Sequence, residues 1–168
     1  MTDRVRQAVF DMLTTRLEFD GIEVLDLFSG SGSLGLEALS RGARHTTFVE
    51  NSRDAIDILR KNIRSLGCEA ESTVHQADVF WYLNHATHPF DLVLLDPPYR
   101  LSSLDELPRA VFASGVVRPG TFVVMEYGRG STVPAPIPEE GAIRRSFGQT
   151  DVLMFRIPAS TTASPGRD

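Results

Sequence analysis

The sequence predicts one α/β domain with a mostly parallel, Rossmann-like sheet of seven strands, an antiparallel C-terminal hairpin and helices on both faces. Three observations support this fold class. Short β-rich runs alternate with amphipathic segments over most of the chain. A glycine-rich stretch at residues 30–35 directly follows the first β-rich run. The last two β-rich runs are joined across Gly148 and Gln149 by a short connection, residues 148–151, which is typical of a hairpin.

Five segments are predicted to be helical because apolar residues recur in them every three to four positions. In the first segment Val5, Val9 and Leu13 share one face, and Thr2 or Asp3 can cap its start. Glycine follows two of the other segments, and glycine readily adopts the left-handed conformation that ends a helix. The five segments are residues 2–16, 34–39, 55–66, 79–84 and 104–113.

The predicted strands are rich in β-branched and aromatic residues. Residues 91–96 form the most apolar run, which indicates a strand covered on both faces. The parallel strands are expected at residues 22–28, 46–50, 72–75, 91–96 and 121–126, and the hairpin strands at residues 142–147 and 152–157.

Composition and length indicate a single soluble domain. The chain has 168 residues, of which 42% are hydrophobic and 23% charged. We expect the domain to span residues 1–158, with a surface loop at residues 130–141 and a disordered tail at residues 159–168. With no membrane-length apolar run and no signal-peptide pattern, a cytoplasmic monomer without a membrane partner is expected. One cysteine and four histidines without ligand spacing predict no metal site.

Residues 30–35 fit the G-x-G-x-x-G pattern of nucleotide-binding loops, although a tight turn without a ligand would also fit it. Glu50 follows about 20 positions after the first glycine, the spacing at which a carboxylate meets a ribose hydroxyl. Asp26 lies at the tip of the preceding strand, where it would repel a pyrophosphate and attract the ammonium group of S-adenosylmethionine (SAM). The acid therefore favours SAM over NAD, although Asp26 could cap the following turn with either ligand.

Asp78 follows the third parallel strand, where the exocyclic amine of an adenine would lie. Val79 would offer a backbone N–H to the same ring, and Phe80 an apolar face. The alternative role for Asp78 is to cap the helix that starts after it.

The tetrapeptide Asp96-Pro97-Pro98-Tyr99 is the most informative motif in the chain. Its prolines cannot donate backbone hydrogen bonds, so the segment must leave the sheet at the carboxyl end of its strand, where ligands bind. Asp96 and the Pro97 carbonyl can accept the two N–H hydrogens of a planar amine, and Tyr99 can stack on the attached ring. Such contacts align the nitrogen lone pair with a methyl donor. The alternative is a rigid loop with a buried aspartate.

Together the motifs resemble class I SAM-dependent methyltransferases with a DPPY motif. The closer resemblance is to the RsmD family, bacterial enzymes that methylate the N2 amine of one guanine in small-subunit (16S) ribosomal RNA. It is carried by residues 2–6, 24–43, 48–50, 91–99 and 147–150. The resemblance implies a class I methyltransferase fold, SAM as the cofactor, and ribosomal RNA or the small ribosomal subunit as the partner.

The resemblance also implies the residues of the site. The target-amine group consists of Asp96, Pro97, Pro98 and Tyr99. The SAM-binding group consists of Asp26, Phe28, Ser29, Gly30, Ser31, Gly32, Glu50, Asn51, Asp78 and Val79.

Members of the family usually carry a basic β-hairpin arm before the segment that corresponds to residues 2–6, and that arm is implicated in RNA binding. This sequence begins inside the segment, so the arm is expected to be absent, through a trimmed chain, a misassigned start or a real loss. The net charge of −5 argues against a broad surface for nucleic acid. The candidate RNA contacts are Arg4, Arg6, Arg100 and Arg145, although scattered arginines are more commonly solvated surface.

The residues leave the methylated target open. A DPPY motif suits any planar amine, so the N6 amine of DNA adenine and the amide of a protein glutamine are alternative targets. A different class of function is an NAD-binding module or an NAD-dependent oxidoreductase. Against a dehydrogenase, no His or Lys lies at a strand end as an obvious acid for hydride transfer.

Overall fold

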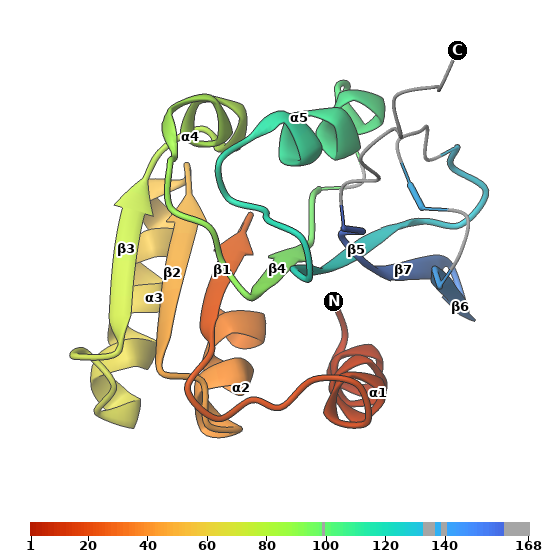
Figure 1. Cartoon of the computed structure of the whole chain (residues 1–168). Helices are drawn as coiled ribbons and strands as arrows, with labels where there is room; N and C mark the ends of the chain where they lie inside the picture. The colour runs from red at the N-terminus through yellow and green to blue at the C-terminus, as the bar shows by residue number, and fades with distance from the viewer. Residues whose placement is uncertain (99, 133–136, 139–140, 160–168) are drawn as a thin grey trace, which may run out of the picture.

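The computed structural model describes residues 1–98, 100–132, 137–138 and 141–159. Its strands are β1 (Glu23–Leu27), β2 (His45–Glu50), β3 (Ser72–Gln76), β4 (Leu92–Leu95), β5 (Phe122–Gly128), β6 (Ile143–Phe147) and β7 (Thr150–Arg156). They form one sheet in the order β3-β2-β1-β4-β5-β7-β6 (Figure 1). Neighbours from β3 to β5 are parallel, whereas β7 runs antiparallel to both β5 and β6. The predicted fold class is confirmed.

The helices are α1 (Asp3–Thr14), α2 (Ser33–Ser40), α3 (Arg53–Leu66), α4 (Val79–His85) and α5 (Leu107–Ala113). The single helix expected at residues 104–113 is wrong in one respect, because a separate 3₁₀ turn, Leu104–Glu106, precedes α5. Pro108 lies in the first turn of α5, where its ring would clash with the carbonyl of Leu104 in a continuous α-helix. The proline therefore fixes where the α-helix begins.

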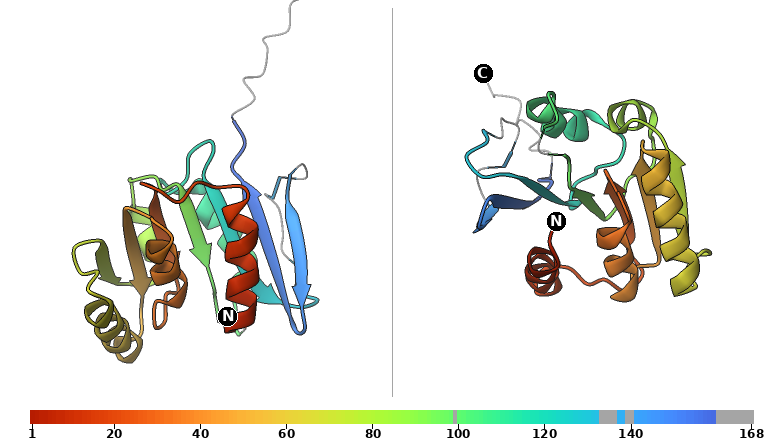
Figure 2. Two further views of the ribbon diagram at one scale, coloured as in Figure 1. Left: turned by 90° about the horizontal axis from the view of Figure 1, so that it is seen from below. Right: turned by 180° about the vertical axis from the view of Figure 1, so that it is seen from behind.

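Helices cover both faces of the sheet, as Figures 1 and 2 show. On one face Val79 of α4 and Leu107 of α5 belong to a buried cluster with the strand residues Leu25, Val49 and Val93. On the other face, buried side chains of α1 and α2 pack on the intervening strand residues, and α3 joins α2 over β2. This alternation is the period of two expected for strands that are buried on both sides.

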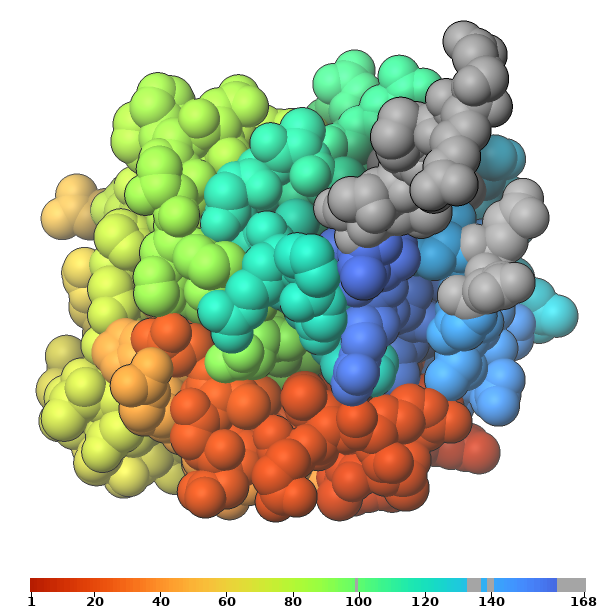
Figure 3. All heavy atoms as spheres, in the orientation of Figure 1, coloured from red at the N-terminus to blue at the C-terminus, as the bar shows by residue number. Residues whose placement is uncertain are grey.

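Helix α1 crosses the C-terminal half of the sheet and is seen in front of it in the left view of Figure 2. Phe10 and Leu13 of α1 are fully buried and share an apolar cluster with Leu94, Val124 and Met154, from β4, β5 and β7. In the space-filling view the N-terminal segment, in red and orange, runs alongside the blue C-terminal strands (Figure 3). This packing holds the start of α1 close to the carboxyl ends of β4 and β5.

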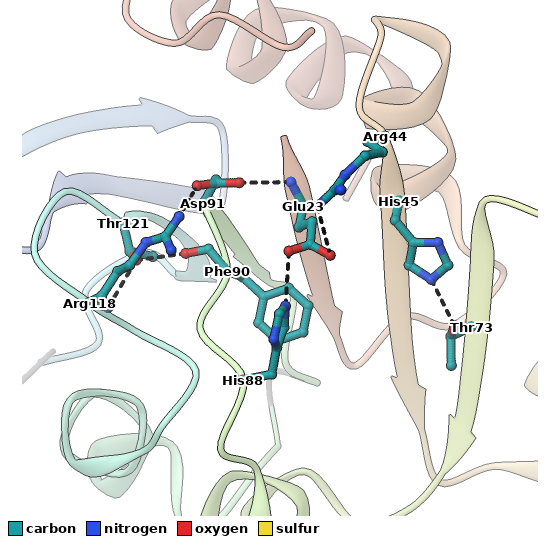
Figure 4. A network of polar contacts seen from close by, with 9 residues as sticks. All are labelled: Glu23, Arg44, His45, Thr73, His88, Phe90, Asp91, Arg118 and Thr121. Atoms are coloured by element: carbon teal, nitrogen blue, oxygen red, sulfur yellow. Dashed lines mark hydrogen bonds and ion pairs between the residues drawn. The ribbon is translucent and has the colours of Figure 1, made fainter. Parts of the chain in front are cut away.

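Ion pairs and hydrogen bonds between charged side chains stabilise the amino-terminal edge of the sheet (Figure 4). The carboxylate of Glu23 lies 3.3 Å from Arg44 and 2.9 Å from His88. Asp91 accepts a hydrogen bond of 2.9 Å from the backbone N–H of Glu23 and pairs with Arg118 at 2.5 Å. These contacts join the entry segments of β1, β4 and β5, and they lie at the opposite edge from the expected ligand site.

Most predicted boundaries lie within one or two residues of the observed ones. Strand β1 ends before Phe28, because that residue adopts a left-handed φ of 59° and leaves the strand. The expected surface loop at residues 130–141 holds no helix or strand in its described residues. Tyr99 and residues 160–168 of the expected tail lie outside the described residues.

Candidate active site

A cavity of about 670 Å³ opens at the carboxyl ends of the parallel strands. Here the strand order reverses, because β1 has β2 on one side and β4 on the other. Open α/β sheets bind ligands at such a switch point. The lining residues are Met1, Phe28, Ser29, Gly30, Ser31, Ser33, Glu50, Asn51, Ser52, Asp78, Val79, Asp96, Pro98 and Leu101.

The turn between β1 and α2 supplies the wall of the cavity nearest to β1. Gly30 and Gly32 have φ values of 54° and 88°, which glycine adopts without steric cost. Ser29 holds the turn in place, since its N–H donates to the Val49 carbonyl at 3.1 Å and its hydroxyl to the Asp26 carbonyl at 2.8 Å. The turn is therefore held in place by contacts to β1 and β2.

Two glycines of the motif are required by packing behind this turn. A Cβ atom on Gly35 would lie 2.4 Å from the Phe48 ring, and one on Gly32 would lie 2.3 Å from Leu59. A Cβ on Gly30 would meet no atom within 4 Å. Gly32 and Gly35 thus let α2 approach β2 and α3 closely, whereas Gly30 borders open space in the cavity.

Asp26 lies beneath the turn and is not part of the cavity wall. Its Oδ2 accepts a hydrogen bond of 2.9 Å from the N–H of Gly35. Burial raises the pKa of Asp26 to about 8; the hydrogen bond opposes this shift, and the charges of Asp96 and Glu50 add to it. The geometry matches the turn-capping role considered for this residue, and a direct contact with SAM stays a prediction.

The ends of β2 and β3 place acidic and polar groups on the side of the cavity away from β4. Glu50 is the last residue of β2, and Asn51 follows it directly. Asp78 accepts a hydrogen bond of 2.9 Å from the Trp81 N–H, so it caps α4, and it also lines the cavity. The two roles considered for Asp78 are thus compatible.

Asp96 and Pro98 line the end of the cavity next to β4. Pro97 is buried and does not line it, and Tyr99 lies outside the described residues. The side chain of Asp96 is 25% exposed, and its Oδ2 accepts a hydrogen bond of 2.7 Å from the amino nitrogen of Met1. This contact shows that the Asp96 carboxylate is placed to receive an N–H donor inside the cavity.

The environment of that nitrogen favours a positive charge. Burial lowers the pKa of the Met1 amino group, but the hydrogen bond to Asp96 and the charges of Asp96 and Glu126 outweigh this effect, and the net shift is upward. Glu126, on β5, is only 2% exposed and lies 3.6 Å from the same nitrogen. A nitrogen that gains positive charge is therefore stabilised at this end of the cavity.

The sequence reasoning missed Glu126, Ser33, Ser52 and Leu101. Ser33, Ser52 and Leu101 line the cavity at the ends of segments that the patterns had identified. Glu126 interrupts an otherwise apolar strand, and a charged residue at such a position was the available signal. What the sequence lacked was the strand order that brings β5 next to β4.

None of the four candidate RNA-binding arginines lines the main cavity. Arg4 borders a second cavity, of about 340 Å³, together with Phe147 and Gly148 of the hairpin. Arg100 is exposed between Pro98 and Leu101, at the rim of the main cavity. Arg6 pairs with Asp3 at 3.1 Å, and Arg145 is exposed on β6.

The described part of the chain contains neither a cluster of metal ligands nor a helix that could span a membrane. No group of three or more His, Cys, Asp or Glu side chains there could hold a metal ion. None of the helices there has the length and apolar character needed to cross a membrane.

Comparison with known proteins identifies the family. The family model described as Conserved hypothetical protein 95 matches residues 1–156. The chain belongs to this family. It is the RsmD family, so the resemblance inferred from the motifs is confirmed, and the chain is a SAM-dependent methyltransferase.

Two curated relatives and one solved structure illustrate the match. YlbH of Bacillus subtilis, whose name assigns it to the rRNA methyltransferases, is 32% identical over 92% of this chain and 85% of its own length. Ribosomal RNA small subunit methyltransferase D of Haemophilus influenzae is 32% identical over 74% of this chain and 65% of its own. The structure of the Escherichia coli methyltransferase yhhF superposes with a TM-score of 0.82 at 30% identity, covering 95% of this chain and 87% of the other.

Proposed function

We propose that this RsmD-family protein transfers the methyl group of SAM to the exocyclic N2 amine of a guanine in small-subunit ribosomal RNA. The observation that carries the proposal is the meeting of two motifs in one cavity. The glycine turn with Glu50 and Asp78 forms one end, and Asp96 with Pro98 forms the other. A methyl donor and a planar amine would therefore bind next to each other.

The residues present fit SAM. Gly30 leaves open space beside the turn, Glu50 offers a carboxylate for ribose hydroxyls, and Asp78 and Val79 suit an adenine edge. When bound, SAM supplies a methyl group on a sulfonium, a good electrophile that needs no metal to activate it. Among the described residues that line the cavity there is no arginine or lysine, which agrees with a cofactor that lacks phosphate.

Asp96 and the proline turn act on the amine. The Asp96 carboxylate is placed to accept one N–H, and the Pro97 carbonyl would accept the other. These two contacts fix the plane of the NH₂ group and direct its lone pair along the approach to the methyl carbon. The fixed backbone of the two prolines keeps both acceptors in position without a loss of entropy during the reaction.

The choice of ribosomal RNA rests on the relatives, because the amine contacts would suit other planar amines. The Haemophilus influenzae relative is named for the small-subunit ribosomal RNA, and the Bacillus subtilis relative for rRNA. Arg4 and Arg100 are proposed as phosphate contacts beside it, since both are exposed near lining residues.

The proposal is tested with small ribosomal subunits from a bacterial strain that lacks its RsmD-family gene. Purified protein and SAM with a labelled methyl group are added, and the ribosomal RNA is then digested to nucleosides. We expect label in N2-methylguanosine, and none when the protein is omitted. Absence of label from RNA of both intact subunits and free transcripts would refute the substrate assignment.

A further inference from the structure

We propose that Glu126 is a second catalytic carboxylate, which faces the target amine together with Asp96, stabilises its positive charge during methyl transfer and receives its proton. This inference rests on the proposed function, since it concerns the same reaction. It adds a residue outside the DPPY motif, from a different strand of the sheet. Three independent features of the structure support it.

The first feature is strand register. Strands β4 and β5 are parallel neighbours, and Leu95 lies opposite Met125. Glu126 follows Met125 on β5, and Asp96 follows Leu95 directly, one residue beyond the end of β4. Because side chains at equivalent positions of paired strands point to the same face of a sheet, both carboxylates lie on the face that α1 covers. The sheet itself therefore places the two acids side by side.

The second feature is convergence on one point. The amino nitrogen of Met1 lies 2.7 Å from Asp96 Oδ2 and 3.6 Å from Glu126 Oε2. Whatever group occupies this point, a nitrogen there is within hydrogen-bond distance of one carboxylate and within ion-pair distance of the other. The point lies at the end of the cavity where Asp96 and Pro98 form the wall. The Met1 amino nitrogen occupies this point, so a planar amine held by Asp96 would take its place and lie near both carboxylates.

The third feature is the difference in burial between the two acids. The Asp96 side chain is 25% exposed and lines the cavity, whereas Glu126 is 2% exposed and is not among the lining residues. A buried carboxylate acts on a nearby charge through a medium of low polarity, where its field is screened little by water. Asp96 is therefore suited to bind and orient the entering amine, and Glu126 to respond to charge that develops on it.

The reaction needs such a group because the amine becomes a cation. The nitrogen lone pair forms a bond to the methyl carbon, the bond from carbon to sulfur breaks, and its electron pair stays on the sulfur. The nitrogen then carries two hydrogens, a methyl group and a positive charge. One N–H proton passes to the Glu126 carboxylate, which leaves a neutral secondary amine, and the resulting carboxylic acid returns the proton to solvent.

The test compares Glu126→Gln and Glu126→Asp with the wild type in single-turnover methylation of small ribosomal subunits. Gln keeps the shape but not the charge, and we expect its rate to fall roughly 100-fold, in the range typical of a lost acid–base or charge-stabilising group. Asp keeps the charge on a shorter side chain, and we expect it to recover at least a tenth of the wild-type rate. The SAM dissociation constant from calorimetry and the melting temperature should change little in either variant.

Glu23→Gln is the matched control, because it removes a strand carboxylate at the opposite edge of the sheet. Two outcomes overturn the inference: a Gln variant with a rate within threefold of the wild type, or one that loses rate and SAM affinity in parallel. Wild-type protein that is inactive on subunits would instead contradict the proposed function. The same variants would then be compared on whichever planar amine the wild type methylates among RNA, DNA and glutamine-containing peptides.

Discussion

At the scale of single residues, Asp26 in β1 and Asp96 just after β4 show how burial gives two aspartates different roles. Asp96 is partly exposed and accepts an N–H donor inside the cavity. Asp26 is almost completely buried and accepts a backbone N–H from the turn that it supports. The first is suited to binding and the second to building the site. Substitutions at the two positions should therefore affect different properties.

Replacing Asp96 by Asn should separate chemistry from cofactor binding. The variant keeps the shape of the side chain and one acceptor oxygen but loses the negative charge, so the cation that forms on the amine is no longer stabilised. We expect the methyl-transfer rate to fall by about 100-fold or more, while the SAM dissociation constant stays within about threefold of the wild type. Single-turnover kinetics and calorimetry measure the two quantities. Equal losses in both would mean that Asp96 binds the cofactor and not the amine.

Replacing Asp26 by Asn should change how stability depends on pH. The pKa of Asp26 is raised from 3.8 to about 8 in the folded chain, so between these values the folded state holds a proton that the unfolded state has lost. Stability then falls as pH rises through this range, by up to about 1.4 kcal/mol per pH unit, and levels off above pH 8. Asn does not titrate, so the stability of the variant does not fall with pH for this reason.

Urea unfolding at pH 6 and at pH 8.5 measures the effect. The free energy of unfolding of Asp26→Asn, minus that of the wild type, should increase as pH rises. The other titrating groups are common to both proteins and cancel in this difference. Stability curves that stay parallel over this interval would contradict the raised pKa of Asp26.

At the scale of elements, the turn between β1 and α2 shows how the glycines of a sequence motif are required by backbone conformation and by packing. Its glycines serve two purposes, a left-handed backbone at Gly30 and Gly32 and close contact at Gly32 and Gly35. The G-x-G-x-x-G pattern predicted the turn and its place after a strand. It did not reveal that the third glycine is required by the Phe48 ring, because that contact depends on how α2 lies on β2.

Replacing Gly35 by Ala tests this packing. Gly35 lies inside α2, where alanine is intrinsically favoured by about 1 kcal/mol. The new methyl group would lie 2.4 Å from Phe48 and 2.7 Å from Thr46, so steric overlap should outweigh this preference. We expect a net loss of about 1–3 kcal/mol in the free energy of unfolding, and weaker SAM binding because the turn is displaced.

Gly21→Ala is the control for that variant, because Gly21 does not line the cavity and a Cβ there would meet no atom within 4 Å. Its φ of 77° predicts strain of about 1–2 kcal/mol with unchanged SAM affinity. A Gly35→Ala protein as stable as the wild type would show that the strands and α2 readjust easily.

At the scale of the whole molecule, the sequence predicted the elements better than their mutual positions. Apolar periodicity identified the five helices and seven strands, since each must bury one face or both. The split before α5 was missed because Pro108 falls within a continuous apolar pattern. The pairing of Asp96 with Glu126 was missed because it follows from strand order and register, which no local pattern contains. Most predicted cavity residues belong to the two motifs, and most of them lie on the cavity wall. Asp26, Gly32 and Pro97 do not line it, and Tyr99 lies outside the described residues.

Recognition of RNA is also a property of the whole surface. With a net charge of −5, the chain is expected to bind RNA through a few arginines, and affinity should depend only modestly on salt. Arg4→Ala should weaken binding to small ribosomal subunits and reduce the slope of log affinity against log salt by about 1. Filter binding over a series of potassium chloride concentrations measures the slope.

Arg118→Ala is the comparison for that variant, since Arg118 lies at the amino-terminal edge, bound to Asp91. It should leave the slope unchanged. An equal reduction by both substitutions would indicate a nonspecific effect of net charge and would remove Arg4 from the RNA-binding surface.

The position of Trp81 makes it an intrinsic fluorescent reporter of the cavity. It is the chain's single tryptophan, its side chain is 58% exposed, and it stacks on His85 at a ring separation of 4.3 Å. Its backbone N–H is bonded to Asp78, which lines the cavity. A ligand that reorganises this corner would alter the surroundings of the indole, so tryptophan fluorescence would follow cofactor occupancy without a label and without a second tryptophan to interfere.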